Sequence, residues 1–247
     1  MCSRMGEGIR GYKEFDGRPI GARDFPMGGS EREAVDWMRE HTNAEALIAE
    51  AATDRAARES FDDWTTGHFM HGQQYKGWDN MTTRDQLMTQ TYDDYLDRAT
   101  VSAPVTIMRL ATPELLGLGR DLPTAEQLAA LKGATVTSRG HMSCAAAKEG
   151  LTISFSTRPY TVGKFIEYKF NIPGGTKGAG MWIGDSRINP TWGARQREFM
   201  MNRDTEWRVG DAKYDSHRGC YVVEMEWVGR HEHDYGTTGR RPRYDRD

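Results

Sequence analysis

The sequence lacks the features that would direct a chain to a membrane or to an oxidising compartment. It has no run of about 18 or more apolar residues, so no membrane-spanning helix is expected. Residues 1–15 contain no apolar stretch of the kind found in secretory signals. The three cysteines, Cys2, Cys144 and Cys220, are too few and too scattered for a disulfide framework. We therefore expect a protein of the reducing cytoplasm with no membrane partner.

A strong excess of charge of one sign is also missing. The formal net charge is −3, which gives no reason to expect nucleic acid or an anionic membrane as a partner. Hydrophobic residues make up 37% of the 247 residues and charged residues 28%, so the chain can form a packed core. This composition indicates a folded globular protein.

The N-terminal part begins with an extended segment and continues with helical patterns. Residues 1–29 are rich in Gly, Arg and Pro and predict an N-terminal arm. Ser30 and Glu33 form a capping box, which predicts a first helix. Asn43 can cap a second helix that runs through about Arg58.

The next segment is less regular before a third helix begins. Residues 61–78 are aromatic and contain glycine, which predicts irregular but packed chain. Thr82 or Thr83 can begin a helix whose apolar residues recur at the helical period as far as Ala99. Residues 30–100 are therefore expected to form a helical part.

Alternating patterns of apolar and polar residues replace the helical period after residue 100. These patterns predict strands in the segments 105–109, 166–172, 205–209 and 221–227, and residues 133–143 predict a strand and a turn. Thr124 and Gln127 form a capping box for a short helix through Leu131. Residues 101–229 are therefore expected to form a β-core.

Helices that precede a set of strands are typical of the α+β class. We expect a single domain over residues 30–229, which joins the helical part to the β-core. The last segment, 230–247, is charged and rich in glycine, and it predicts a flexible tail.

Two segments place polar residues where a strand would carry apolar ones. If residues 196–200 are extended, Gln196 and Glu198 point to one side, about 7 Å apart, as suits a ligand with hydroxyl groups. In the strand at 105–109, Arg109 shares a face with Val105 and Ile107, which is costly unless an anion meets it. A guanidinium fits a phosphate, so the two segments together indicate a nucleotide-sugar substrate.

The order of these motifs resembles the arginine–serine–glutamate class of mono-ADP-ribosyltransferases. In that family one strand ends in arginine, a second opens with a Ser-Thr-Ser-like motif, and a third begins with Glu-x-Glu or Gln-x-Glu. The corresponding residues here are Arg109 in "VTIMRL", Ser143 in "HMSCAAA", and Gln196-Arg197-Glu198. The resemblance covers residues 60–229, and the stretch from Gln196 onward is most similar to the host-modifying transferases of T-even phages.

The resemblance implies a fold and a reaction. The expected fold is the ADP-ribosyltransferase fold, with N-terminal helices packed on a split mixed β-core that has an NAD cleft. NAD would be the substrate, no metal would be needed, and ADP-ribose would pass to a host or phage protein with release of nicotinamide. The protein would then act in the host cytoplasm or be packaged in a virion.

The resemblance also implies roles for individual residues. Arg109 would bind the NAD phosphates, and Ser143 would support the glutamate or the cofactor by hydrogen bonds. Phe155 would stack on nicotinamide. Glu198 would bind the ribose 2′-hydroxyl and stabilise developing positive charge, while Gln196 would face the acceptor. The loop 185–195, which contains Trp192, would contact the target protein.

Three positions depart from the usual family pattern. Leu110 stands where glycine usually follows the arginine. Cys144 and Ala145 replace two hydroxyl residues of the serine motif. Gln196 replaces a glutamate that goes with arginine acceptors in the family, and a glutamine cannot supply that charge. We therefore do not expect arginine to be the acceptor.

Other interpretations of single motifs stay open. Arg109 could form a structural ion pair, Phe155 could belong to the core, and Ser154–Thr157 is a rival for the serine motif. The arginines after residue 239 could contact RNA or a partner. His231 and His233 match no standard zinc spacing, and Gly174–Gly180 lacks the order of a phosphate loop, so we favour a solvated tail and a turn for these segments.

Two other functions would use the same sequence. The first is an NAD glycohydrolase, which would use the same residues without a protein acceptor. The second is a structural component of a virion that keeps a degenerate transferase fold. The sequence does not determine the acceptor residue or the oligomeric state.

Overall fold

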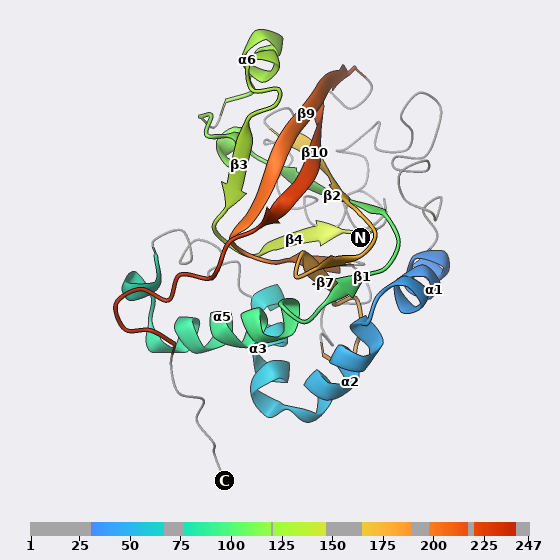
Figure 1. Cartoon of the computed structure of the whole chain (residues 1–247), viewed down its shortest axis with the longest axis vertical. Coiled ribbons are helices and arrows are strands. Elements are labelled where there is room, and N and C mark those ends of the chain that lie inside the picture. The colour runs from blue at the N-terminus through green and yellow to red at the C-terminus, as the bar shows by residue number, and fades with distance from the viewer. Residues whose placement is uncertain are drawn as a thin grey trace, which may run out of the picture.

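The fold was analysed in a computed structural model that describes residues 31–66, 77–119, 121–146, 165–188, 198–216 and 220–240. Figure 1 shows the N-terminal helices gathered on one side of the molecule, below a set of twisted strands. The strands form one mixed sheet of eight strands and a separate pair. The prediction of an α+β fold is confirmed.

The helical part differs from its prediction at one break. Its elements are α1 (Glu31–His41), α2 (Ala44–Thr53), α3 (Arg55–Thr66), η2 (Trp78–Asn80) and α5 (Thr83–Leu96). The single helix expected through Arg58 is divided at Asp54, whose carboxylate accepts the backbone N–H groups of Ala56 and Ala57 at 2.9 and 3.2 Å. Asp54 therefore caps a new helix, because its side chain satisfies amides that the first turn leaves unpaired. This helix continues to Thr66, so residues 61–66, which were expected to be irregular, are helical.

Asn43 does not act as the expected cap of α2. Its side-chain amide donates to the carbonyl oxygen of Arg98 at 2.9 Å, and its side-chain oxygen accepts from the N–H of Thr100 at 2.8 Å. These two bonds join the start of α2 to the chain that leads from α5 into the first strand. The capping box at Ser30 lies outside the described residues.

The start of α5 agrees with its prediction. Thr82 is the N-cap, and its hydroxyl oxygen accepts the N–H of Asp85 at 3.2 Å. Tyr92 and Tyr95 of this helix are buried and pack edge-on against Phe61 of α3, with ring centroids 4.7 and 5.8 Å apart. These aromatic contacts fix the two helices against each other.

The strands after residue 98 are interrupted by two short helical turns. The elements are β1 (Thr100–Val101), β2 (Val105–Ala111), η3 (Pro113–Leu116), α6 (Ala125–Ala130), β3 (Thr135–Ser138), β4 (Met142–Ala145), β5 (Ile166–Ile172), β6 (Thr176–Lys177), β7 (Gly180–Trp182), β8 (Glu198–Met201), β9 (Thr205–Asp215) and β10 (Cys220–Arg230). The capping box of α6 is confirmed, since Thr124 and Gln127 each accept the other's backbone N–H.

The order of the large sheet is β3-β9-β10-β5-β2-β4-β8-β7. Only β5 and β10 are parallel neighbours within it, and the other pairs are antiparallel. The central strand β5 has the predicted bounds, but its polar face is also buried, with Glu167 0% and Lys169 2% exposed. The alternating pattern of β5 therefore does not mark a solvent-exposed face.

The sheet changes direction between β2 and β4. A single residue pair, Met108 with Ala145, joins these strands, whereas β2 pairs with β5 along its whole length. Figure 1 shows β4 lying across the view while β9 and β10 rise steeply. The bend brings the end of β2 close to β4 and β8.

The chain after β10 packs against the helices. Tyr235 meets Trp78 edge-on with ring centroids 4.9 Å apart, and Arg240 forms an ion pair with Asp94 of α5. The carboxylate of Asp79 accepts the N–H of Thr237 at 2.9 Å. Residues 231–240 therefore differ from the flexible tail expected from residue 230, because their aromatic and charged side chains find partners on η2 and α5.

The helices that the structure describes are all too short or too polar to cross a membrane.

Candidate active site

Three neighbouring strands carry the residues that the sequence analysis singled out. Arg109 lies in β2, Ser143 in β4 and Glu198 in β8, and these strands are adjacent in the sheet. Ser143 pairs with Met200, and Glu198 is two residues from Met200 along β8. Ser143 and Glu198 are therefore diagonal neighbours on one face of the β4–β8 pair.

Arg109 reaches from β2 to β4. Its guanidinium donates a hydrogen bond to the backbone carbonyl oxygen of Ser143, and the side chain is half-buried. Across the strand pair from Arg109 lies Tyr168, whose hydroxyl donates to the carbonyl oxygen of Thr112 at 3.0 Å. Burial raises the pKa of Tyr168 and the charge of Arg109 opposes this rise, so the two side chains are close enough to interact.

Glu198 combines deep burial with incomplete hydrogen bonding. The residue is 1% exposed, and burial raises the pKa of its carboxyl to about 7, against the lowering effects of a hydrogen bond with the Ser143 side chain and the charge of Arg109. Its Oε2 atom has no hydrogen-bond partner among the described residues. A buried acceptor that lacks a donor is costly, so this atom is suited to accept a hydrogen bond from a bound molecule.

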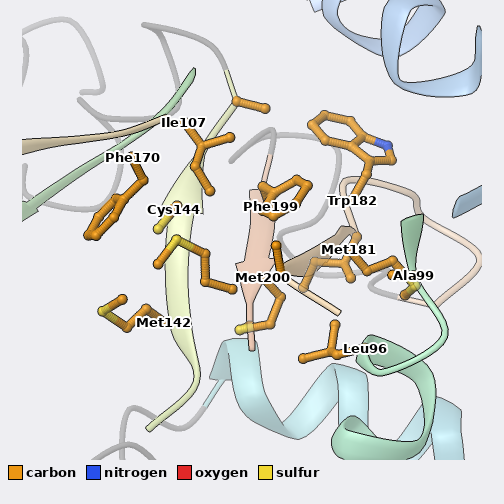
Figure 2. Close-up of a cluster of buried hydrophobic side chains, with 14 of the residues drawn as sticks. Leu96, Ala99, Ile107, Met142, Cys144, Phe170, Met181, Trp182, Phe199 and Met200 are labelled. Atoms are coloured by element: carbon orange, nitrogen blue, oxygen red, sulfur yellow. The ribbon is translucent and has the colours of Figure 1, made fainter. Parts of the chain in front are cut away.

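Cys144 lies beside the site but is not suited to be a nucleophile. Figure 2 shows its side chain among buried apolar groups, between Phe170 of β5 and Phe199 of β8. Burial raises the pKa of this thiol to about 12. The thiolate, which is the reactive form, is therefore scarce near neutral pH.

Several predicted site residues lie outside the part of the chain that the structure describes. These are Gln196, Phe155 and Trp192, together with the rival serine motif at 154–157. The described chain includes the first residues of the predicted acceptor loop, where Arg187 contacts Glu45 of α2 and Asp185, both at 2.8 Å. These ion pairs attach the start of the loop to the helical part. Leu110, at the position where the sequence analysis expected glycine from the resemblance, is buried in β2.

The described residues contain no group of three or more His, Cys, Asp or Glu side chains placed to hold a metal ion. The side chain of His233, assigned to a solvated tail by its sequence context, is 3% exposed and lies 2.9 Å from Asp204 and 3.0 Å from Asp97. These carboxylates raise the pKa of His233 against the lowering effect of its burial. Its surroundings are an ion-pair network.

The sequence analysis missed Asp93, which is fully buried in α5 and contacts both His141 and Arg203. No sequence spacing could have revealed this cluster, because Asp93 is 48 residues from His141 and 110 residues from Arg203 along the chain. An acidic residue on the otherwise buried stretch of α5 was the one available signal, since such a residue needs a partner.

Comparisons with known proteins give a match in structure alone. No protein-family model and no curated protein matches the chain. The solved structure of C3stau2 from S. aureus, determined with NAD, has a TM-score of 0.61 and 15% identity, and the match covers 82% of this chain and 97% of that one. For Plx2a, an ADP-ribosyltransferase toxin from Paenibacillus larvae, the TM-score is 0.63 at 14% identity, with 81% and 96% covered.

A third match is the C3 exoenzyme of Clostridium limosum, with a TM-score of 0.59, 15% identity, and coverage of 81% of this chain and 95% of that chain. At such low identity the likeness shows the fold. The chain therefore has the ADP-ribosyltransferase fold predicted from its sequence.

Proposed function

We propose that this protein transfers ADP-ribose from NAD to a side chain of an acceptor protein and releases nicotinamide. The observation that carries the proposal is the environment of Glu198, a buried carboxylate bonded to Ser143, close to Arg109, and with one oxygen lacking a described donor. The fold shared with Plx2a, an ADP-ribosyltransferase toxin, and with C3stau2, whose structure was determined with NAD, supports the same conclusion.

The chemistry of the three residues fits NAD. A guanidinium such as that of Arg109 suits the negatively charged pyrophosphate, to which it can donate more than one hydrogen bond. The unpaired Oε2 of Glu198 suits a ribose hydroxyl, which has a proton to donate. Ser143 would hold the carboxylate in place through its hydroxyl. These side chains therefore provide complementary groups for two chemically different parts of the dinucleotide.

The proposed reaction needs a negative charge beside the nicotinamide ribose. When the bond between the ribose carbon and nicotinamide breaks, both electrons leave with the nicotinamide nitrogen, and positive charge develops on the ribose. The ionised carboxylate of Glu198 would stabilise this charge in a site from which water is excluded. A nucleophilic atom of the acceptor would then bond to the same carbon and lose its proton.

The proposal also assigns residues that contact the acceptor and the nicotinamide. Gln196 would face the acceptor and Phe155 would stack on nicotinamide, as the family resemblance implies. The loop that begins at Asp185 would contact the acceptor protein. The similarity to host-modifying phage transferases supports a bacterial host protein as the acceptor, within a single domain over residues 30–229.

The proposal is tested with NAD labelled in its ADP-ribose part, incubated with a bacterial extract. We expect the unmodified protein to label an extract protein and Glu198→Gln to lower that labelling by about a hundredfold or more, because the charge is lost. Arg109→Ala should weaken NAD binding about tenfold or more in calorimetry. Circular dichroism provides the folding control for both variants.

Three outcomes would contradict the proposal in different ways. Labelling that persists in Glu198→Gln would remove the site assignment. Free ADP-ribose without labelled protein would indicate an NAD glycohydrolase. A folded protein that binds no NAD, and is present in stoichiometric amounts in virus particles, would indicate a structural role.

A further inference from the structure

A deeply buried charged group outside the proposed site is the carboxylate of Asp93 in α5. Its side chain is 1% exposed and accepts from Arg203 at 2.9 and 3.0 Å and from the hydroxyl of Tyr235 at 2.9 Å. The Nε2 atom of His141 lies 3.1 Å from its Oδ1 atom. Because an ionised carboxylate only accepts, this nitrogen carries the proton.

The charge of Asp93 is well compensated. Its burial favours the neutral acid, but hydrogen bonding with His141 and the charge of Arg203 outweigh this and hold its pKa well below the usual range. Several other groups surround the same carboxylate or its partners, namely His233, Asp97, Asp204, Arg230 and Arg240. The ionised carboxylate of Asp93 therefore connects α5 to the loop at His141, the loop at Arg203 and the C-terminal segment.

The two loop residues that contact Asp93, His141 and Arg203, lie next to the ends of the strands that carry Ser143 and Glu198. His141 immediately precedes β4, and Arg203 follows β8 by two residues. The last residue pair of the two strands at this end is Met142 with Met201. The carboxylate thus bonds to residues that flank this last pair on both strands.

We propose that Asp93 is a positioning residue of the active site, which fixes β4 against β8 so that Ser143 and Glu198 stay within hydrogen-bond distance. The inference rests on the proposed function for its catalytic meaning. In physical terms, the ion pairs and hydrogen bonds of Asp93 at one end of this short strand pair set the distance between Ser143 and Glu198.

The strand pair itself provides little to fix its register. Each strand has four residues, and the side chains that accompany Ser143 and Glu198 include three methionines, Met142, Met200 and Met201. Methionine adapts to many surroundings, so it specifies register weakly. A shift by one residue would turn Ser143 to the other face and break its bond with Glu198. The contacts of Asp93 with His141 and Arg203, at the end of the β4–β8 pair, would prevent such a shift.

The test measures the pKa of Glu198 directly, by carbon NMR titration of protein labelled in its glutamate carboxyl groups. The resonance is assigned by its loss in Glu198→Gln. Ser143→Ala should raise this pKa by about one pH unit, because it removes a hydrogen bond to the charged form. Asp93→Asn should also raise the pKa of Glu198. In the double variant with Ser143→Ala, it should raise this pKa no further than Ser143→Ala alone.

The control is Phe61→Leu, a substitution in the core between α3 and α5 that changes none of the side chains bonded to Asp93. It should lower Tm without changing the pKa of Glu198. If Asp93→Asn behaves like this control, with a lower Tm and an unchanged Glu198 pKa, the residue is merely structural and the proposal is wrong.

A second pair of variants covers the case in which Asp93→Asn does not fold. Tyr235→Phe removes one hydroxyl, and Arg203→Lys keeps the charge but loses the two-pronged contact. Each should raise the pKa of Glu198 by a smaller amount, and unchanged values in both would overturn the inference. The titration needs no NAD turnover, so a protein that shows these shifts but transfers no ADP-ribose would refute the proposed function alone.

Discussion

Glu198 is subject to two opposing physical demands. Its burial favours the protonated acid and raises the pKa of the carboxyl to about 7. The proposed chemistry needs the ionised form, because only a negative charge stabilises the positive charge that develops on the ribose. Ser143 and Arg109 favour ionisation and bring the pKa close to neutrality. A small change at either residue should therefore change how much of the enzyme is active at neutral pH.

We predict that the rate of nicotinamide release rises with pH through about 7. Below that value the fraction of ionised Glu198 falls about tenfold for each pH unit, so kcat/KM for NAD should fall in proportion. The measurement is kcat/KM from about pH 5 to about pH 9. Circular dichroism at each pH checks that the fold is retained. A rate that is flat across this range would show that Glu198 is not the titrating group.

A second prediction concerns stability and has the opposite sign. The native state holds the proton of Glu198 more tightly than the unfolded state, in which the pKa of this carboxyl is near the ordinary glutamate value of 4.5. Ionisation therefore removes stability as the pH rises from about 4.5 to about 7. Glu198→Gln lacks this titration. The free energy of unfolding of the variant, relative to that of the wild type, should therefore rise by about 3 kcal/mol between about pH 4.5 and about pH 7.

The measurement is urea unfolding of both proteins at about pH 4 and about pH 8. Ser143→Ala is the matched comparison, because it keeps the titrating carboxyl and should lose more stability than the wild type over the same range. A constant difference between the wild type and Glu198→Gln would mean that Glu198 titrates normally.

Among the elements, α5 has the most unusual surface. It buries Gln86, Thr89 and Asp93 together with its aromatic residues. The side-chain amide of Gln86 donates to the carbonyl oxygen of Trp78 at 2.8 Å, which joins the helix to η2. The segment 231–240 packs on this helix, where Tyr235 supplies its hydroxyl to Asp93 and Arg240 forms an ion pair with Asp94. The C-terminal segment therefore completes the packing of a helix far from it in the sequence.

We predict that a chain ending at Arg230 is less stable by about 3 kcal/mol or more. The truncation leaves the buried Asp93 without Tyr235 and His233, and it uncovers Trp78, whose indole N–H otherwise donates to Gly239 at 3.1 Å. Denaturant unfolding measures the loss. The control is a chain ending at Arg240, which keeps every contact named here. Equal stability of the two truncated chains would contradict the assigned role of residues 231–240.

Across the whole molecule, the helices and the sheet share one core. A single cluster of buried apolar residues includes Leu47 and Tyr92 from the helices and Phe170 and Trp207 from the strands. Figure 2 shows Leu96 and Ala99 beside Met181 and Met200. Neither part can bury its apolar side without the other.

We therefore predict that residues 99–247 alone do not form a cooperative fold. The apolar side of β7 and β8 would face water, which favours a collapsed chain that binds a hydrophobic dye and lacks a near-ultraviolet dichroism signal. Both signals can be compared with those of the whole chain. Cooperative unfolding of the fragment would divide the proposed single domain into two.

The patterns that predicted structure correctly are those that act within a few residues. The capping box at Thr124, the start of α5 at Thr82 and the strand 166–172 each depend on neighbours along the chain. The break at Asp54 escaped prediction although it is local, because the helical pattern continues on both sides of it. The order of the motifs indicated the ADP-ribosyltransferase fold, which the structure has.

The encounter of Arg109, Ser143 and Glu198 depends on both kinds of information. The sequence identified these residue types and their order, but their distance depends on which strands become neighbours and in which register. The Asp93 cluster and the anchored segment 231–240 arise from packing alone, because they join residues far apart in the chain. Local patterns encode helices and strands through neighbouring side chains, whereas the partners of a buried charge are selected only when those elements pack together.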